Sequence, residues 1–283
     1  MKGYQKVWAA LNRQRIARPP AGEVLLTDGF INQFNEDSLE SVLAYLNTDL
    51  VTLKIDAGKS ENRWYYWYQQ GYFSFGLTQG PFTLMANKLG WPDMAYLIVN
   101  KPAEAGVIMK GLVNQGYELV FQALDAGCEG IIIADDLAGK KGMLVSPEFL
   151  NNYYFPLLTR FLQRLGCNEV PFIFHSDGNI LDIILSLKAT GFWGVQSLQP
   201  SAGIRIDTLP HDVLKDWVFW GNYEFEDTVG MKSFQQVKKE VNELLTGWSS
   251  YPGYIFGSSG GLYEGIPHEI VKTAYTALHR WKR

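Results

Sequence analysis

Residues 130–136 read GIIIADD, an apolar run that ends in two adjacent carboxylates. A run of β-branched and small residues of this length is typical of a strand buried on both faces, as in parallel α/β sheets. Residues 171–179, PFIFHSDGN, repeat the pattern, with a short apolar run followed by polar side chains and a glycine. Buried strands that end in polar side chains are therefore the feature from which the fold is predicted.

The same pattern recurs along the chain, and a longer helical pattern follows most of the runs. The predicted strands are VLLT (24–27), LVTLKI (50–55), YFSF (72–75), GIIIA (130–134), PFIF (171–174), WGVQS (193–197), VFWGN (218–222) and YIFG (254–257). The predicted helices cover 38–46, 103–127, 147–166, 180–191, 234–247 and 268–281. Eight strands alternating with helices predict an α/β fold, the (β/α)8 TIM barrel. The competing doubly wound sheet normally has a glycine-rich turn after its first strand, and the sequence has none.

The composition argues against several classes of protein. The 283 residues carry 25 basic and 29 acidic side chains, a net charge of −4, and no block of Lys and Arg, which argues against a nucleic-acid partner. No apolar run reaches the roughly 18 residues of a membrane span. The two cysteines exclude a disulfide scaffold and fit a reducing compartment, so we expect a cytoplasmic protein without membrane association. No linker-like stretch interrupts the chain, which predicts a single domain, 1–283, with residues 1–20 as a helical leader.

In such a barrel the active site lies at the carboxyl ends of the strands, on the loops that converge at one rim. Reading the residues just past each predicted strand gives candidates that we expect to surround one cavity for a small-molecule substrate. These candidates are Asp28, Asp56, Asp135, Asp136, His175, Asp177, Gln196, Asn222, Glu224, Ser258 and Ser259.

His175, Asp177 and Asp136 are the expected catalytic residues. Positions i and i+2 of an extended chain point to the same side, so His175 and Asp177 could share a ligand or a metal. The structural alternative is that Asp177 caps the following helix and His175 makes a structural hydrogen bond. Two adjacent carboxylates are costly to ionise side by side, so we expect one of Asp135 and Asp136 to face the pocket and the other to turn toward backbone or solvent.

The aromatic segment RWYYWYQQGYFSF, residues 63–75, has two interpretations. It is either a wall on which a planar ligand stacks or part of the packed core.

Several motifs occur in a characteristic order: ADD (134–136), VSPEFL (145–150), FHSDGN (174–179), GVQSLQP (194–200), WGN (220–222) and YIFGSSGG (254–261). Their order and spacing, over roughly residues 24–280, resemble the uroporphyrinogen decarboxylase superfamily. The resemblance implies a (β/α)8 barrel with its pocket at the strand carboxyl ends. It also implies an enzyme, since the superfamily contains decarboxylases and corrinoid-dependent methyltransferases.

The decarboxylase's own substrate-binding residues are mostly replaced. Its arginine-rich segment corresponds to LLTDGFINQF (25–34), which has no arginine, while its pyrrole-binding aspartate corresponds to Asp49. Its tyrosine falls at Asn87, and its last-loop histidine at about Gly260. A substrate with many carboxylates needs cationic partners, whereas the predicted rim is acidic. The resemblance therefore favours the methyltransferase branch over uroporphyrinogen decarboxylation.

The zinc-dependent thiol methylases of the superfamily use a His-x-Cys pair and a further cysteine in the last strand loop. Here the pair reads His175-Ser176-Asp177, and Gly260 stands in the last loop. We expect a harder, more open site in which His175, Asp177 and Glu224 bind a divalent metal such as zinc, with Asp136 as a further candidate ligand. Such a site would polarise an ether or phenolic oxygen rather than activate a thiol.

The leading functional hypothesis is a methyltransferase that moves a methyl group from a small methylated substrate, such as a methoxyaromatic, to a corrinoid protein. This O-demethylation uses a cobalamin-type corrinoid carried by the partner, because the chain has no corrinoid-binding sequence that we identify. Glu224 and Asn222 would position the substrate. Two alternatives stay open, a decarboxylase (a lyase) in which Asp136 or Asp49 stabilises a protonated intermediate, and a non-catalytic tetrapyrrole-binding barrel. A homodimer also remains open.

Overall fold

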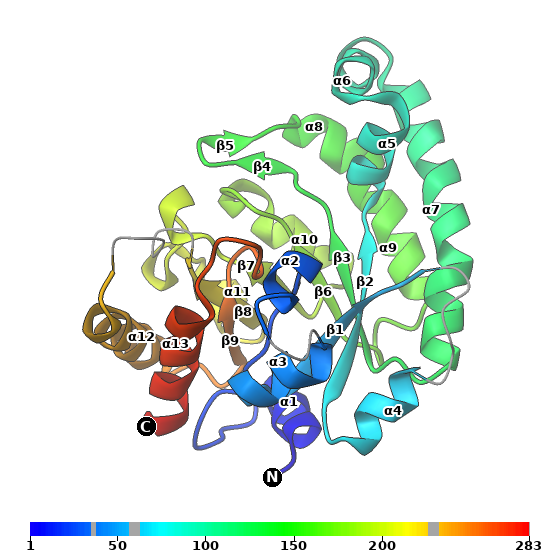
Figure 1. Ribbon diagram of the computed structural model, residues 1–283. Helices are drawn as coiled ribbons and strands as arrows, with labels where there is room; N and C mark the ends of the chain where they lie inside the picture. The colour runs from blue at the N-terminus through cyan, green and yellow to red at the C-terminus, as the bar shows by residue number, and fades with distance from the viewer. Residues whose placement is uncertain (35–37, 57–62, 226–231, 283) are drawn as a thin grey trace.

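The computed structural model describes residues 1–34, 38–56, 63–225 and 232–282. Its main feature is one sheet of seven parallel strands in the order β1-β2-β3-β6-β7-β8-β9 (Figure 1). The strands are β1 (Leu50–Lys54), β2 (Phe73–Gln79), β3 (Gly130–Ala134), β6 (Phe172–His175), β7 (Gly194–Ser197), β8 (Val218–Tyr223) and β9 (Tyr254–Ser258). All seven were predicted within a few residues of these bounds, and the α/β class with parallel strands is confirmed.

Helices connect the strands and cover the outer face of the sheet (Figure 1). The α-helices are α1 (Gly3–Leu11), α2 (Asp28–Ile31), α3 (Leu39–Leu46), α4 (Arg63–Gln69), α5 (Pro81–Leu89), α6 (Trp91–Asn100), α7 (Pro102–Asp125), α8 (Pro147–Phe149), α9 (Phe155–Arg164), α10 (Ile184–Thr190), α11 (His211–Leu214), α12 (Phe234–Trp248) and α13 (His268–Arg280). Shorter elements are the hairpin β4 (Ala138–Gly139) and β5 (Gly142–Met143), the π-helical turn η1 (Leu150–Tyr154), and the 3-10 turns η2 (Leu181–Ile183), η3 (Pro200–Ala202) and η4 (Ile206–Thr208). None of the helices in the described ranges has the length and apolarity needed to cross a bilayer.

The sheet is curled, so that its two edge strands share one interior. Leu50 of β1 and Ile255 of β9 belong to the same buried apolar cluster, together with Ile132 of β3 and Ile173 of β6. Side chains from opposite edges of a flat sheet could not meet in this way. The architecture is therefore TIM-barrel-like, with one face of the sheet turned inward.

The eighth predicted strand, 24–27, is not a regular strand. The extended segment 20–26 forms isolated bridges, with Ala21 beside Phe256 and Leu26 beside Leu262. It contacts the other edge as well, since Asp49 N donates to Ala21 O at 2.7 Å. The segment lacks two backbone donors for a regular strand pairing. Pro20 has no N–H, and the Ala21 N–H donates to the Asp49 carboxylate.

The N-terminal helix closes one end of this interior. Val7, Ala10 and Leu11 of α1 pack in the interior cluster, and Trp8 meets Phe73 edge to face with ring centroids 5.3 Å apart. Because Phe73 is the first residue of β2, α1 covers the amino ends of the strands. The predicted leader is helical only to Leu11.

Part of the aromatic segment 63–75 packs in the core, whereas Tyr65, Tyr66 and Tyr68 are exposed. Trp64 and Trp67 on α4 are buried, and Phe73 and Phe75 of β2 point into the interior cluster. Much of the segment precedes β2, which places α4 toward the amino end of the strands, away from the carboxyl rim (Figure 1). The core interpretation is thus the correct one for these side chains, and a ligand wall at the rim is not.

Helix α5 begins at a buried carboxylate that comes from another strand. Gly80, its N-cap, has no side chain to cap the helix. Asp135, just past β3, accepts hydrogen bonds from Phe82 N at 3.0 Å and Thr83 N at 2.6 Å. It also accepts one from the Tyr154 hydroxyl at 2.8 Å. The first N–H groups of a helix lack partners within the helix, so this carboxylate satisfies them and complements the helix dipole.

Replacing Gly80 by Ala should destabilise the protein by about 1–3 kcal/mol, because the added methyl group would lie 2.3 Å from Asp135 Oδ2 and overpack this contact. The matched control is Gly111→Ala in α7, where no atom lies within 4 Å of the new methyl group and alanine should stabilise the helix by up to about 1 kcal/mol. Urea unfolding measures both. Equal midpoints for wild type and Gly80→Ala would contradict the packing described.

Candidate active site

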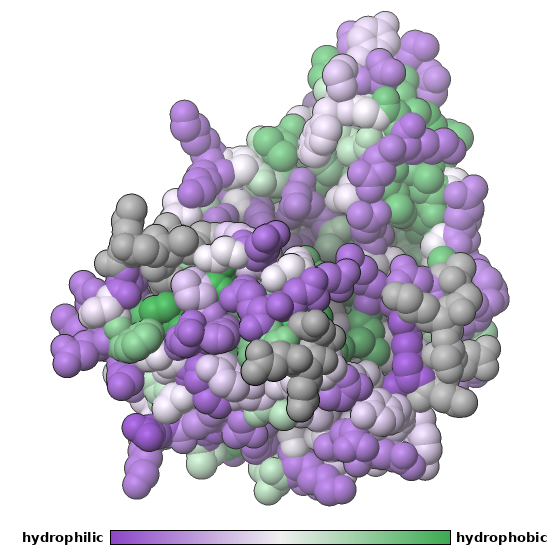
Figure 2. Space-filling model, in the orientation of Figure 1, coloured by the Kyte–Doolittle hydropathy of each residue, from purple (hydrophilic) through white to green (hydrophobic). Residues whose placement is uncertain are grey.

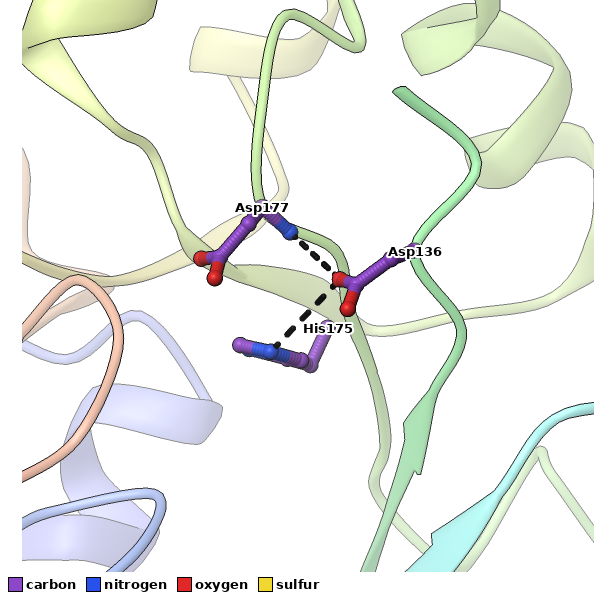
Figure 3. Close-up of side chains that lie close together, drawn as sticks. All are labelled: Asp136, His175 and Asp177. Atoms are coloured by element: carbon purple, nitrogen blue, oxygen red, sulfur yellow. Dashed lines mark hydrogen bonds and ion pairs between the residues drawn. The ribbon is translucent and has the colours of Figure 1, made fainter. Parts of the chain in front are cut away.

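Asp136, His175 and Asp177 meet at the carboxyl ends of β3 and β6 (Figure 3). One ligand atom from each lies within 4.8 Å of the others, a spacing that could hold a metal ion. Figure 2 shows the surface hollowed at the centre of this face, between the projecting column of α5, α6 and α7 and the rest of the molecule. The structure therefore brings the three predicted catalytic residues together.

The two adjacent acids past β3 point in opposite directions, and Asp136 is the one that faces the site. Adjacent residues leaving a strand point to opposite sides, and Asp135 is fully buried against the start of α5. The Asp136 side chain is 55% exposed, and its Oδ1 accepts a hydrogen bond from Asp177 N at 2.9 Å. Ser176 also holds the two strand exits together, because its hydroxyl accepts from Leu137 N at 3.2 Å. The expected division between the two adjacent acids is confirmed.

His175, the last residue of β6, is held by the neighbouring strand. Its Nδ1 is hydrogen-bonded to Gln196 Oε1, and its Nε2 lies 4.0 Å from Asp136 Oδ1. The Gln196 amide in turn donates to Ser258 O at 2.9 Å and Ser259 O at 3.2 Å. The ring is therefore oriented by one nitrogen and presents the other to the carboxylate.

Asp177 is oriented by the end of β7. Its Oδ1 accepts from the Ser197 hydroxyl at 2.8 Å. Ser197 has a φ of 92°, a left-handed conformation that costs energy for a residue with a side chain and that is often found at functional sites. The first N–H of the turn η2, that of Leu181, donates to Asn179 Oδ1 at 3.1 Å and not to Asp177.

Glu224, an expected metal ligand, lies outside the cluster. Its Oε2 accepts from Ser201 N at 2.9 Å and its Oε1 from the Ser201 hydroxyl at 2.6 Å. Both carboxylate oxygens are thus used to hold the turn η3. The structure groups Asp136, and not Glu224, with His175 and Asp177, and metal binding by this corrected set stays a prediction.

Three further candidates make structural contacts instead of joining the cluster. Asn222 donates to Leu198 O and accepts from the Trp248 indole at 3.2 Å, inside the core. Asp49 lies at the amino end of β1, beside Lys6 at 2.7 Å and Arg18 at 3.4 Å, and is therefore at the opposite end of the sheet. Ser258 donates its hydroxyl hydrogen bond to a buried carboxylate, that of Glu23.

The remaining candidates lie on the rim or support it. Asp28 begins α2 and Asp56 follows β1; both are exposed and neither belongs to the three-residue cluster. Gln196 is buried behind His175. Ser259 is buried as well, and its hydroxyl has no hydrogen-bond partner within the described part of the chain.

Sequence reasoning missed two residues that shape the site, Ser197 and Glu23. Glu23 accepts from Ser258 N at 3.0 Å and from the Tyr275 hydroxyl at 2.7 Å. A carboxylate within the otherwise apolar run AGEVLL (21–26) was the available signal, because a buried carboxylate must have partners. Ser197 carried no signal, since its positive φ follows from the tertiary structure.

Fold and site define an α/β protein with a polar site at the carboxyl ends of a curled parallel sheet. The family model "Uroporphyrinogen decarboxylase (URO-D)" matches residues 72–281, about three quarters of the chain. The chain belongs to the uroporphyrinogen decarboxylase family, which confirms the superfamily expected from the motifs.

Curated relatives and solved structures agree with this assignment. A uroporphyrinogen decarboxylase of Anaeromyxobacter dehalogenans is 24% identical over 214 residues, covering 73% of this chain and 59% of the relative. A uroporphyrinogen decarboxylase of Geobacter sp. strain M21 is 25% identical over 216 residues, covering 74% of this chain and 60% of the relative. The chain thus spans about three fifths of the length of these relatives. A methyltransferase from Methanosarcina mazei has a similar fold, with a TM-score of 0.74, 14% identity and coverage of 99% of this chain and 98% of that chain.

Burial raises the pKa of Asp135 from 3.8 to about 6, although hydrogen bonds from Thr83, Tyr154 and Phe82 oppose the shift. The folded state therefore holds the Asp135 proton more tightly than the unfolded state, and the stability this provides is lost as the pH rises through about 6. The free energy of unfolding of wild type, relative to Asp135→Asn, should fall by on the order of 3 kcal/mol between pH 4 and pH 7.

Chemical denaturation across this pH range measures that difference. The control is Asp125→Asn, the same change at an exposed position in the last turn of α7, where burial does not act on the carboxylate. A difference between wild type and Asp135→Asn that does not change, or that increases, with pH would contradict the raised pKa.

Proposed function

We propose that the chain is a methyltransferase that transfers a methyl group from a small methylated substrate, such as a methoxylated aromatic, to the corrinoid of a partner protein. The observation that carries the proposal is the cluster of one imidazole and two carboxylates at the carboxyl rim. The fold it shares with a methyltransferase supports the proposal at the level of architecture.

The donor set of the cluster fits a divalent cation such as zinc. Asp136 and Asp177 each use Oδ1 in a hydrogen bond, and among the described residues no hydrogen-bond donor contacts their Oδ2 atoms. The His175 Nε2 faces the same space. Carboxylate oxygens and an imidazole nitrogen are among the ligands of zinc, and catalytic zinc sites have three protein ligands with one position open. The exposure of Asp136 leaves room for a further ligand. When bound, a divalent cation would supply Lewis acidity toward an ether oxygen.

The chemistry requires help for the leaving oxygen. When the methyl carbon passes to the reduced cobalt of the corrinoid co-substrate, the cobalt provides the bonding pair and the C–O pair stays on the oxygen. That oxygen is a strong base unless its charge is neutralised, and it finally takes up a proton. Asp136, beside the His175 ring and with its side chain exposed, would orient a water or hydroxyl group that delivers this proton.

Ser259 adds a substrate contact to this proposal. A buried hydroxyl without a partner is costly, and a bound substrate or a water is the usual means of satisfying it. Ser259 lies close to the cluster through Gln196, whose amide bonds both the Ser259 carbonyl and the His175 ring. We also infer that the segment 20–26 takes the place of the eighth strand, because it is hydrogen-bonded to both edges of the sheet.

The family match favours one second candidate, a decarboxylase acting on a small acid. In this alternative a protonated side chain of the cluster would stabilise the intermediate. Release of carbon dioxide from candidate acids, without methyl transfer, identifies this reaction.

Purified protein mixed with cob(I)alamin and a panel of neutral methoxyaromatics, such as methoxyphenols, should form methylcobalamin, which is followed by its absorbance. His175→Ala and Asp136→Ala should each lower the rate at least about 100-fold, the usual effect of losing an acid, base or metal ligand. Asp125→Ala, an exposed aspartate at the opposite end of the strands, should retain the wild-type rate. The proposal is wrong if no methoxyaryl, methylamine or methylthiol donor is demethylated, or if His175→Ala is fully active.

Zinc titration against a chromophoric chelator tests the corrected ligand set. Asp136→Ala and Asp177→Ala should each weaken zinc binding by about 10-fold or more, since each removes a charged ligand. Glu224→Ala should bind zinc as the wild type does, because that carboxylate holds Ser201. A loss of affinity confined to Glu224→Ala would restore the original assignment and reject the present one.

A further inference from the structure

We propose that Gln196 is a positioning residue that keeps the imidazole proton of His175 on Nδ1 and thereby leaves the Nε2 electron pair directed into the site. The position of the proton follows from hydrogen bonds within the chain. Only its consequence, that Nε2 binds a cation, rests on the proposed function.

The orientation of the Gln196 amide is determined by two carbonyl groups. Gln196 is fully buried in β7, directly beside His175 in the parallel register of β6 and β7. One atom of its amide faces Ser258 O at 2.9 Å and Ser259 O at 3.2 Å. Carbonyl oxygens only accept hydrogen bonds, so this atom must be the NH₂ group. The reverse orientation would place an oxygen against two oxygens in a buried environment.

The amide oxygen must then face the His175 ring. An amide oxygen only accepts, so the hydrogen bond between Nδ1 and Oε1 requires the proton on Nδ1. A neutral imidazole carries a single ring proton, and Nε2 is therefore the unprotonated nitrogen. It lies 4.0 Å from Asp136 Oδ1, on the side of the carboxylates. Metal-binding histidines are commonly fixed in this way through their second nitrogen.

The two carbonyl groups are themselves held in place by a buried carboxylate. Glu23 accepts from the backbone N–H of Ser258 at 3.0 Å, and the Ser258 hydroxyl accepts from Gly261 N at 2.8 Å. The Tyr275 hydroxyl anchors the other oxygen of Glu23 at 2.7 Å. A continuous set of hydrogen bonds thus runs from α13 through the loop after β9 to Gln196 and His175. This assigns Gln196, Ser258 and Glu23 to the support of the ring.

Long-range ¹H–¹⁵N correlation spectra of the ¹⁵N-labelled protein, at about pH 8 where histidine is neutral, report the tautomer directly. The His175 signals are identified by their absence in His175→Ala. Wild type should show a protonated Nδ1 and an unprotonated Nε2. Gln196→Met, similar in shape but without the acceptor, should shift His175 toward the Nε2–H tautomer.

The matched control is Gln199→Met, the same change at a glutamine whose Oε1 accepts from Gly178 N and does not touch the ring. It should leave the tautomer unchanged. In the second readout, zinc affinity should fall about 10- to 100-fold in Gln196→Met and stay near wild type in Gln199→Met.

An Nε2–H tautomer in wild type overturns the proposal even if no variant folds, as does an unchanged tautomer in Gln196→Met. If wild type has the expected tautomer but binds no zinc, the positioning role stands and the cation of the proposed function is rejected.

Discussion

The buried carboxylate of Asp135 joins three parts of the rim, and the geometry of the candidate site depends on it. It lies past β3, accepts from the first turn of α5, and accepts from Tyr154 at the end of η1. Three hydrogen bonds offset only part of the cost of burying the charge, and burial still raises the pKa of Asp135. Because this side chain turns away from the rim, the next residue, Asp136, must turn into it.

The rest of the site follows from strand order. Strands β3, β6 and β7 are neighbours in the sheet, so Asp136, His175 and Gln196 leave adjacent strands at one edge. Residues at the end of β7 then orient two side chains of the cluster. Ser197 donates a hydrogen bond to Asp177, and Gln196 accepts one from His175. A substrate with many carboxylates needs cationic partners, whereas this cluster is itself acidic. That difference is why the proposal relies on a cation and a neutral, methylated substrate.

The sequence was sufficient to predict the strands and the cluster, but only part of the surrounding site. Buried parallel strands are nearly all apolar, and the polar residues after them converge by topology alone, which is why Asp136, His175 and Asp177 were predictable. Glu224 and Asn222 follow a strand just as these do. Their partners, Ser201 and Trp248, lie more than twenty positions away in sequence, so that their structural roles appear only in three dimensions. Asp49 was predicted through the resemblance, and its ion pairs with Lys6 of α1 and with Arg18 are seen only in the structure.

The most direct test of the central claim is anomalous diffraction at the zinc absorption edge from crystals of the protein grown with zinc. The account predicts one strong peak bounded by His175 Nε2 and by carboxylate oxygens of Asp136 and Asp177. It further predicts that this peak disappears in crystals of Asp136→Ala. Zinc bound at Glu224 without these three residues, or a well-ordered rim without any peak, would contradict the claim that this cluster is a cation site.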